Sequence, residues 1–222
     1  MQTLIGIGSY GVPEAARLAQ VNTRTAARWV TGSGASLRGR LLRPDLPRIG
    51  DRHALSFLDL VDLLVVGRFR DLGVSLQTVR RVYARLSETL DSRHPFSHHR
   101  LLTDGRTVFL ETLDRVGDDH LEEVLSGQRA MPEILVPYLK QIEYARTTHI
   151  AVRWNIFPGV VLDPDRCLGK PIIANEGVTT HVLASAYHAN GENADLVADL
   201  FDVAPEAVRQ AARFEGEFAR AA

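Results

Sequence analysis

Small and apolar side chains recur at helical spacing in residues 10–30 and predict two short helices joined by a tight turn. Pro13 fits the first turn of the first helix, because a proline there loses no hydrogen bond. Asn22 or Thr23 can cap a second helix over residues 24–30, since either side chain can accept from a free backbone N–H. The pattern therefore predicts a helix-turn-helix.

Glycine and proline are frequent in residues 31–52, where residues 37–42 form the one plausible strand. Glycine-rich ends around an arginine-bearing strand are typical of a β-hairpin wing. The chain from residue 1 to about 92 then reads as one mainly helical unit that carries this wing.

Two longer helices complete this unit. Ser56, with Asp59 three positions later, resembles a capping box and predicts a helix through Arg70. Gly73 is a stop signal, and Ser75 caps the next helix, whose apolar residues recur at helical spacing.

The middle of the chain predicts mixed structure. Asp104-Gly105 lies between apolar residues and predicts a hairpin over residues 101–110. Helical patterns follow at residues 119–125 and 132–144, and residues 149–157 alternate as a strand does.

Pro158-Gly159 breaks the chain, and a short strand at residues 160–162 follows. Three helices are expected afterwards, over residues 180–188, 193–201 and 205–214. We predict a mainly α protein with small β hairpins. Its three parts are a winged helix-turn-helix domain (1–92), a β-hairpin and helix connecting region (93–157) and a C-terminal three-helix, homeodomain-like domain (158–222).

The two ends of the chain share one apolar spacing, at a constant offset of 182 positions. This spacing suits a helix-turn-helix, which needs a small residue where the two helices cross, an apolar residue in the turn and apolar residues that anchor the second helix. The matching sets are Ala16, Leu18, Val21, Ala26 and Trp29 at one end, and Ala198, Leu200, Val203, Val208 and Ala211 at the other. We predict a helix-turn-helix at each end.

The formal net charge of −1 hides an asymmetry along the chain. Residues 1–100 contain 15 arginines and 8 acids, which gives +7, whereas residues 101–222 contain 11 basic residues and 19 acids, which gives −8. A basic end suggests binding to a polyanion. The alternative is that the arginine content reflects genomic composition alone.

Outward-facing side chains distinguish the two predicted helix pairs. Polar groups able to bond base edges or phosphates belong to the first pair and its wing, and we predict that they bind DNA. They are Asn22, Thr23, Arg24, Thr25, Arg28, Arg38, Arg40 and Arg43. The second pair carries Asp195, Asp199 and Asp202, which would repel phosphate, so it is better suited to a protein partner.

Other functional classes find little support. Residues 1–9 lack the features of a secretion signal, and no apolar run is long enough to span a bilayer, so we expect a cytoplasmic protein without membrane contact. The lone Cys167 is too few for a thiolate zinc site. His94, His98 and His99 could converge on a metal, but Pro95 argues against one helix spanning them. We expect no metal, no cofactor and no enzymatic activity.

The residues of both ends resemble known modules. Residues 10–16 and 23–29 resemble the N-terminal winged helix-turn-helix of MerR-like regulators, and residues 72–77 resemble the start of the last helix in such domains. Residues 161–164, 169–172 and 194–215 resemble a homeodomain-like module of bacterial antitoxins that are paired with PIN-domain ribonucleases. The combination resembles VapB-type antitoxins. The resemblance implies a dimeric antitoxin that neutralises a PIN-domain (VapC-type) toxin and represses its own operon by binding operator DNA. The alternative is a MerR-like regulator that responds to a small molecule through its middle and C-terminal segments.

Overall fold

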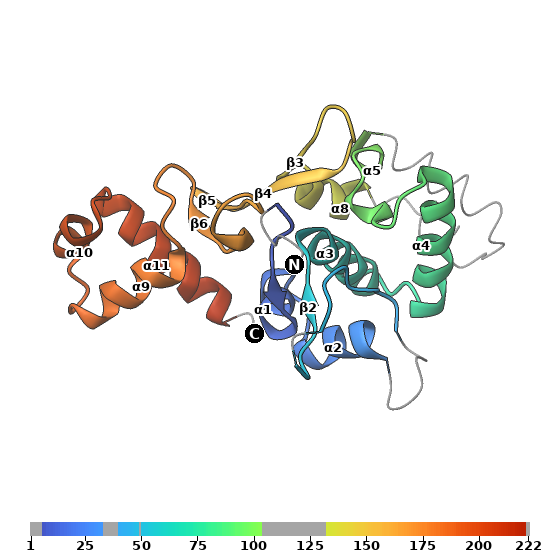
Figure 1. The fold of residues 1–222 in the computed structure, drawn as a ribbon, viewed down its shortest axis with the longest axis horizontal. Helices are drawn as coiled ribbons and strands as arrows, with labels where there is room; N and C mark the ends of the chain where they lie inside the picture. The colour runs from blue at the N-terminus through green and yellow to red at the C-terminus, as the bar shows by residue number, and fades with distance from the viewer. Residues whose placement is uncertain (1–5, 33–39, 49, 104–131, 221–222) are drawn as a thin grey trace.

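The computed structural model describes residues 6–32, 40–48, 50–103 and 132–220, and these form a mainly helical protein with two small antiparallel sheets (Figure 1). The helices are α1 (Val12–Leu18), α2 (Thr23–Thr31), α3 (Phe57–Asp71), α4 (Leu76–Leu90), α5 (Arg100–Thr103), α8 (Pro132–Leu139), α9 (Thr180–Ala189), α10 (Ala194–Phe201) and α11 (Pro205–Arg220). The strands are β1 (Tyr10–Gly11), β2 (Ala54–Leu55), β3 (Ile142–Tyr144), β4 (Ala151–Phe157), β5 (Val160–Leu162) and β6 (Ile172–Ile173), and the short 3₁₀ helices are η1 (Pro95–Ser97) and η2 (Cys167–Gly169). Within these described ranges, no helix is both long and apolar enough to cross a membrane.

The predicted helix pair at the start of the chain is confirmed as α1 and α2. The side chain of Asn22 accepts the backbone N–H groups of the first turn of α2, so it caps that helix. Between the helices, Gln20 adopts a left-handed φ of 54°, and the Val21 amide donates to the Ala16 carbonyl at 2.8 Å. A Cβ added at Gly67 of α3 would lie 2.6 Å from Val21 Cγ2, so α3 lies directly against this turn.

The capping signals of the next two helices are also confirmed. Ser56 and Asp59 form the predicted capping box at the start of α3, with bonds of 2.8 and 3.0 Å. Gly73 follows the end of α3 with a φ of +82°, and Ser75 caps α4. α3 is buried on nearly all sides, because the other elements of the N-terminal half surround it.

The helix predicted over residues 132–144 is too long. It ends at Leu139, and residues 142–144 form strand β3, in which Ile142 is buried and pairs with Trp154 of β4. The spacing of apolar residues alone does not distinguish a helix that continues to residue 144 from a turn followed by a short buried strand. The strands predicted over residues 149–157 and 160–162 are confirmed as β4 and β5 in a sheet of order β3-β4-β5-β6.

The structure contradicts the described parts of two predicted hairpins. Leu41 and Leu42 belong to no strand, because both backbone amides donate to the Trp29 carbonyl at the end of α2, at 2.7 and 3.0 Å. Residues 101–103 lie in helix α5 rather than in a strand. Residues 37–39 of the first predicted hairpin, residues 104–110 of the second and the helix predicted over residues 119–125 lie outside the described residues.

The predicted C-terminal helices are α9, α10 and α11, and the turn between the last two repeats the turn between α1 and α2. Asp202 has a left-handed φ of 52°, and the Val203 amide donates to the Ala198 carbonyl at 3.1 Å. The burial differs, however: Leu18 is 1% exposed and Leu200 is 63% exposed. The repeated spacing therefore predicts the turn correctly but not the surroundings of every apolar position.

The two ends of the chain are joined through the central sheet. Figure 1 shows α9, α10 and α11 at one end, α4 at the other, and strands β3 to β6 between them. The boundary predicted between residues 157 and 158 falls in the turn between β4 and β5, so both sides contribute strands to one sheet. Contacts also tie β1 and α1 to the C-terminal half: the Tyr10 hydroxyl of β1 donates to the Gly169 carbonyl at 2.6 Å, and Arg17 of α1 pairs with Glu215 at 3.2 Å.

Candidate nucleic-acid interface

The outer side of α2 presents five polar residues of the predicted DNA site, which we call the α2 face: Asn22, Thr23, Arg24, Thr25 and Arg28. Four of the five are exposed and Thr25 is half-buried, whereas Ala26, Trp29 and Val30 on the inner side are buried. The sequence therefore assigns the two sides of this helix correctly. A solvent-facing side without any acid can approach a polyanion.

Arg24 and Arg28 give the α2 face its charge. They lie one helical turn apart and are both exposed, and within the described part of the chain neither guanidinium has an ion-pair or hydrogen-bond partner. Asn22 differs, because its side-chain oxygen Oδ1 already accepts hydrogen bonds from the backbone amides of Arg24 and Thr25, at 3.1 and 3.2 Å. Its amide nitrogen remains for an outside contact, so its first role is to fix the start of the helix.

The three arginines predicted for the wing are separated by the structure. Arg38 lies outside the described residues. Arg43 is exposed, whereas Arg40 is half-buried and donates through Nε to the Leu42 carbonyl at 3.0 Å. Because Leu41 and Leu42 are bonded to the end of α2, Arg40 and Arg43 occupy a segment fixed to that helix.

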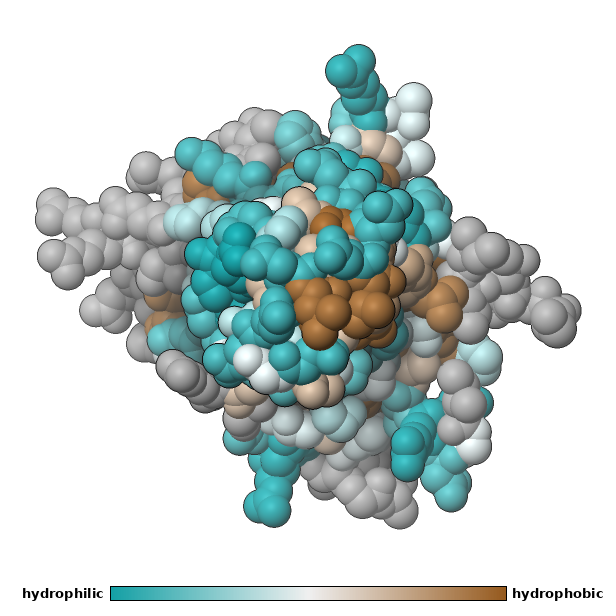
Figure 2. Space-filling model, turned by 90° about the vertical axis from the view of Figure 1, so that its left-hand side faces the viewer, coloured by the Kyte–Doolittle hydropathy of each residue, from teal (hydrophilic) through white to brown (hydrophobic). Residues whose placement is uncertain are grey.

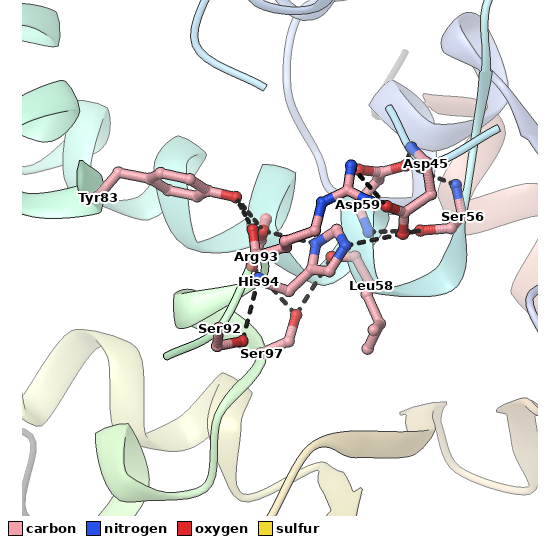
Figure 3. Close-up of polar contacts among 10 residues, drawn as sticks. Asp45, Ser56, Leu58, Asp59, Tyr83, Ser92, Arg93, His94 and Ser97 are labelled. Carbon is pink, nitrogen blue, oxygen red and sulfur yellow. Dashed lines mark hydrogen bonds and ion pairs between the residues drawn. The ribbon is translucent and has the colours of Figure 1, made fainter. Parts of the chain in front are cut away.

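Behind this segment lies a buried polar network that we call the His94 cluster, composed of Asp45, Ser56, Asp59, Asp62, Tyr83, His94 and Ser97 (Figure 3). His94 lies between two carboxylates: its Nε2 is 2.7 Å from Asp45 and its Nδ1 is 3.0 Å from Asp62. Tyr83 and Ser97 donate to Asp62 at 2.9 and 3.1 Å. The cluster thus joins residue 45, α3, α4 and the loop before η1.

Electrostatics hold His94 in its charged form. Burial alone lowers the pKa of His94, but the hydrogen bonds and charges of Asp45 and Asp62 outweigh it and raise the pKa to about 10. His94 in turn lowers the pKa of Asp45. Burial raises the pKa of Asp62 and raises that of Asp59 to about 6. The hydrogen-bond partners of the Asp62 carboxylate are the His94 ring and the hydroxyls of Tyr83 and Ser97, and each hydroxyl also lies within hydrogen-bond distance of a backbone carbonyl.

One possible metal-ligand atom from each of Asp45, Asp59 and His94 lies within 4.8 Å of the other two, which is close enough for a metal site. Protein groups already occupy those atoms. Asp59 Oδ2 accepts the amides of Asp45 and Ser56 at 3.0 and 2.8 Å, and His94 Nε2 is bonded to Asp45. We therefore assign the cluster a structural role. His98 and His99 lie apart from it, beside His149.

Sequence reasoning missed the His94 cluster. The available signal was the pair of acids, Asp59 and Asp62, that interrupts the apolar run from Leu58 to Gly67. An acid inside a helix that is buried on all sides needs a buried partner. The identity of that partner, 32 positions away for Asp62 and His94, does not follow from any local pattern.

A second candidate surface lies on α10, at the opposite end of the molecule. Leu196 and Leu200 are 43% and 63% exposed and lie one turn apart. The acids Asp195, Asp199 and Asp202 beside them are also exposed. Figure 2 shows an apolar patch bordered by hydrophilic residues at this end of the molecule. An apolar stripe framed by acids favours a protein partner over a nucleic acid.

Comparisons with known proteins cover both halves of the chain. Residues 160–214 match the model of one family, described as a protein of unknown function (DUF433), which spans β5 to α11 and less than half of the chain. No curated protein matches the sequence. The chain is similar to the crystal structure of Rv2018 from Mycobacterium tuberculosis, with 28% sequence identity over 91% of this chain and 96% of that chain, and a TM-score of 0.72.

Proposed function

We propose that this protein is a cytoplasmic antitoxin of a type II toxin-antitoxin system. In this proposal it binds operator DNA through the α2 face and represses its own operon, and it neutralises a PIN-domain (VapC-type) ribonuclease through its C-terminal helices. The observation that supports it best is that Arg24 and Arg28 are exposed on α2, the second of two helices joined by a tight turn, with no acidic residue on that helix.

The geometry of α1 and α2 supports the DNA-binding part. The turn is closed by the bond from Val21 to Ala16, and Gly67 lets α3 pack directly against it, which holds α2 rigidly. A rigid helix whose first residues are exposed can insert its N-terminal side chains into the major groove. We infer that this half is a MerR-like winged helix-turn-helix, with residues 40–43 part of the segment that follows the recognition helix.

The C-terminal helices support the partner-binding part. α10 and α11 repeat the turn of α1 and α2, as in a homeodomain-like module, but acids occupy the exposed side. We infer that Leu196 and Leu200 enter a groove of the toxin that is bordered by basic residues, because Asp195 and Asp199 then meet opposite charges.

The protein is proposed to act as a homodimer. Two recognition helices then address half-sites about 34–36 Å apart, one turn of DNA. The alternative function, a MerR-like regulator that responds to a small molecule, is favoured by one observation, an arginine-lined cleft beside residues 40–43.

Co-expression of the full chain with the product of the neighbouring reading frame tests the proposal. We expect a stable complex by native mass measurement, loss of the partner's ribonuclease activity, and retention of the chain's own upstream DNA in a gel-shift assay. DNA binding without any protein complex would instead support the regulator. A chain that binds neither the DNA nor the partner would contradict the proposal as a whole.

A further inference from the structure

A cleft of about 850 Å³ opens between residues 40–43 and α4. Four arginines line it, Arg40, Arg43, Arg80 and Arg93, and we call it the arginine cleft. Its size falls in the range of small-molecule sites, which are commonly about 300–1,000 Å³. The cleft involves neither Arg24 nor Arg28 and lies in the N-terminal half, far in sequence from α10.

The charge of the arginine cleft is not neutralised from within. Glu88 and Asp91 also line it, but Glu88 is paired with Arg85 at 2.8 Å. Arg93 reaches Asp45 at 3.3 Å while its side chain remains 74% exposed. Arg93 and Glu88 are thus each paired with a group outside the lining, and the three other guanidinium groups against Asp91 leave an excess of positive charge that suits an anion.

Arg80 is the best fixed of these arginines. Its Nε donates to the Arg40 carbonyl at 3.3 Å, which ties α4 to the opposite wall. Its Nη2 is buried and has no hydrogen-bond partner in the described residues. A buried guanidinium nitrogen without an acceptor is unfavourable, and a bound oxyanion in the cleft would supply acceptors for this group.

The remaining lining is mixed: Ser87 and Ser92 are polar, and Leu41, Tyr83 and Ala84 supply apolar surface. Leu41, Ala84 and the ring of Tyr83 face the cleft, whereas the Tyr83 hydroxyl is committed to Asp62 and the Arg93 carbonyl, at 2.9 and 2.6 Å. The hydroxyl is thus unavailable to a ligand, and the ring provides a flat wall that Phe96 supports from a ring-centroid distance of 5.2 Å. The ligand that fits combines an anionic group with a flat apolar body.

The geometry points to a binding site, in the arginine cleft, for a small organic anion that carries a phosphate or carboxylate on an apolar body. The anion bonds to Arg80 and its neighbours, and the body packs against Tyr83. Because Arg40 and Arg43 belong both to this cleft and to the candidate DNA interface, bound anion and bound DNA affect each other's affinity. This inference adds a ligand to the chain and does not depend on a toxin partner.

Phenyl phosphate serves as the probe, and calorimetric titration into the full-length protein measures its binding. We expect saturable binding that Arg80→Gln weakens about tenfold, the effect of losing one charge-assisted hydrogen bond. Arg81→Gln removes the same charge from the next position of α4, which is exposed and outside the lining, and should change the affinity less than twofold. Inorganic phosphate should bind more weakly than phenyl phosphate because it lacks the apolar body.

Two further measurements keep the inference separate from folding and from DNA binding. Arg93→Gln changes a largely exposed side chain and should also weaken phenyl phosphate binding, even if Arg80→Gln lowers stability. Absence of saturable binding, or equal affinity in the wild type and both cleft variants, would overturn the inference. So would a finding that Arg80→Gln weakens binding to the upstream DNA while phenyl phosphate does not bind, because the cleft would then hold a DNA phosphate.

Discussion

His94 Nε2 lies 2.7 Å from Asp45 Oδ2, although 49 positions separate the two residues. Asp45 belongs to the segment that follows α2, and His94 to the loop that follows α4. The other nitrogen of the same imidazole binds Asp62 of α3. One charged side chain therefore holds three segments of the N-terminal half together, including the segment that carries Arg40 and Arg43.

Replacing His94 by alanine should destabilise the protein strongly. The substitution leaves the buried carboxylate of Asp62 without its cationic partner, and breaking a buried pair in this way costs about 3–5 kcal/mol. Urea unfolding at neutral pH measures the change. His181→Ala on α9, where the side chain is exposed, is the control and should change stability by less than about 0.5 kcal/mol. Similar small effects of both substitutions would contradict the role assigned to the cluster.

The contribution of His94 to stability should depend on pH with a defined sign. Its pKa is raised to about 10 in the folded protein, so the folded state holds a proton that the unfolded state releases above its ordinary pKa of about 6.5. The contribution is therefore complete below about pH 6.5 and is lost as the pH rises through about 10. The difference in unfolding free energy between wild type and His94→Gln should shrink over this interval. A difference that stays constant would show that His94 is not held as an imidazolium.

The contribution of Asp45 has the opposite sign. His94 lowers the pKa of Asp45, so its part in stability is present above the ordinary aspartate pKa and is lost as the pH falls through the lowered value. Asp45→Asn should therefore approach the wild type in stability in acid and fall below it at neutral pH. Urea unfolding across the acidic range checks this, and an equal deficit at every pH would contradict it.

Sequence and structure agree where the signal is local. Ser56, Asn22 and Ser75 cap the helices that follow them, because a cap depends on a few adjacent residues. The agreement fails where a group distant in sequence binds the backbone. The pattern predicts a strand at Leu41, but the Leu41 amide donates to the carbonyl of Trp29 at the end of α2. The same limit hides the His94 cluster and the arginine cleft, whose members come from segments far apart in the chain.

Two glycine substitutions should have opposite effects. Gly67→Ala places a Cβ 2.6 Å from Val21 Cγ2, and the resulting overpacking between α3 and the turn should cost about 1–3 kcal/mol. Gly216→Ala on α11 meets no atom within 4 Å and should stabilise the protein by about 0.5–1 kcal/mol, because alanine restricts the unfolded chain. Thermal unfolding separates the two. A Gly67→Ala variant that is as stable as the wild type, or more stable, would show that α3 does not press on the turn.

Changes on α10 should separate partner binding from folding. Leu196→Gln with Leu200→Gln alters exposed side chains and should leave the unfolding midpoint nearly unchanged, while affinity for the co-expressed toxin falls at least about tenfold. Val152→Gln on β4, where the side chain is 42% exposed, is the matched control and should leave affinity unchanged. Undiminished affinity in the α10 variant would move the toxin site elsewhere.

DNA affinity of the Arg24→Ala/Arg28→Ala variant tests the central claim most directly. The control is Arg209→Ala/Arg213→Ala, which removes two exposed arginines at the same spacing from α11. With upstream DNA titrated at several salt concentrations, we predict at least about thirtyfold weaker binding for the α2 variant, from about 1–3 kcal/mol per arginine. The salt dependence should also fall by about two counterions if both arginines contact phosphates. Affinity equal to that of the control variant would contradict the assignment of α2 as the recognition helix.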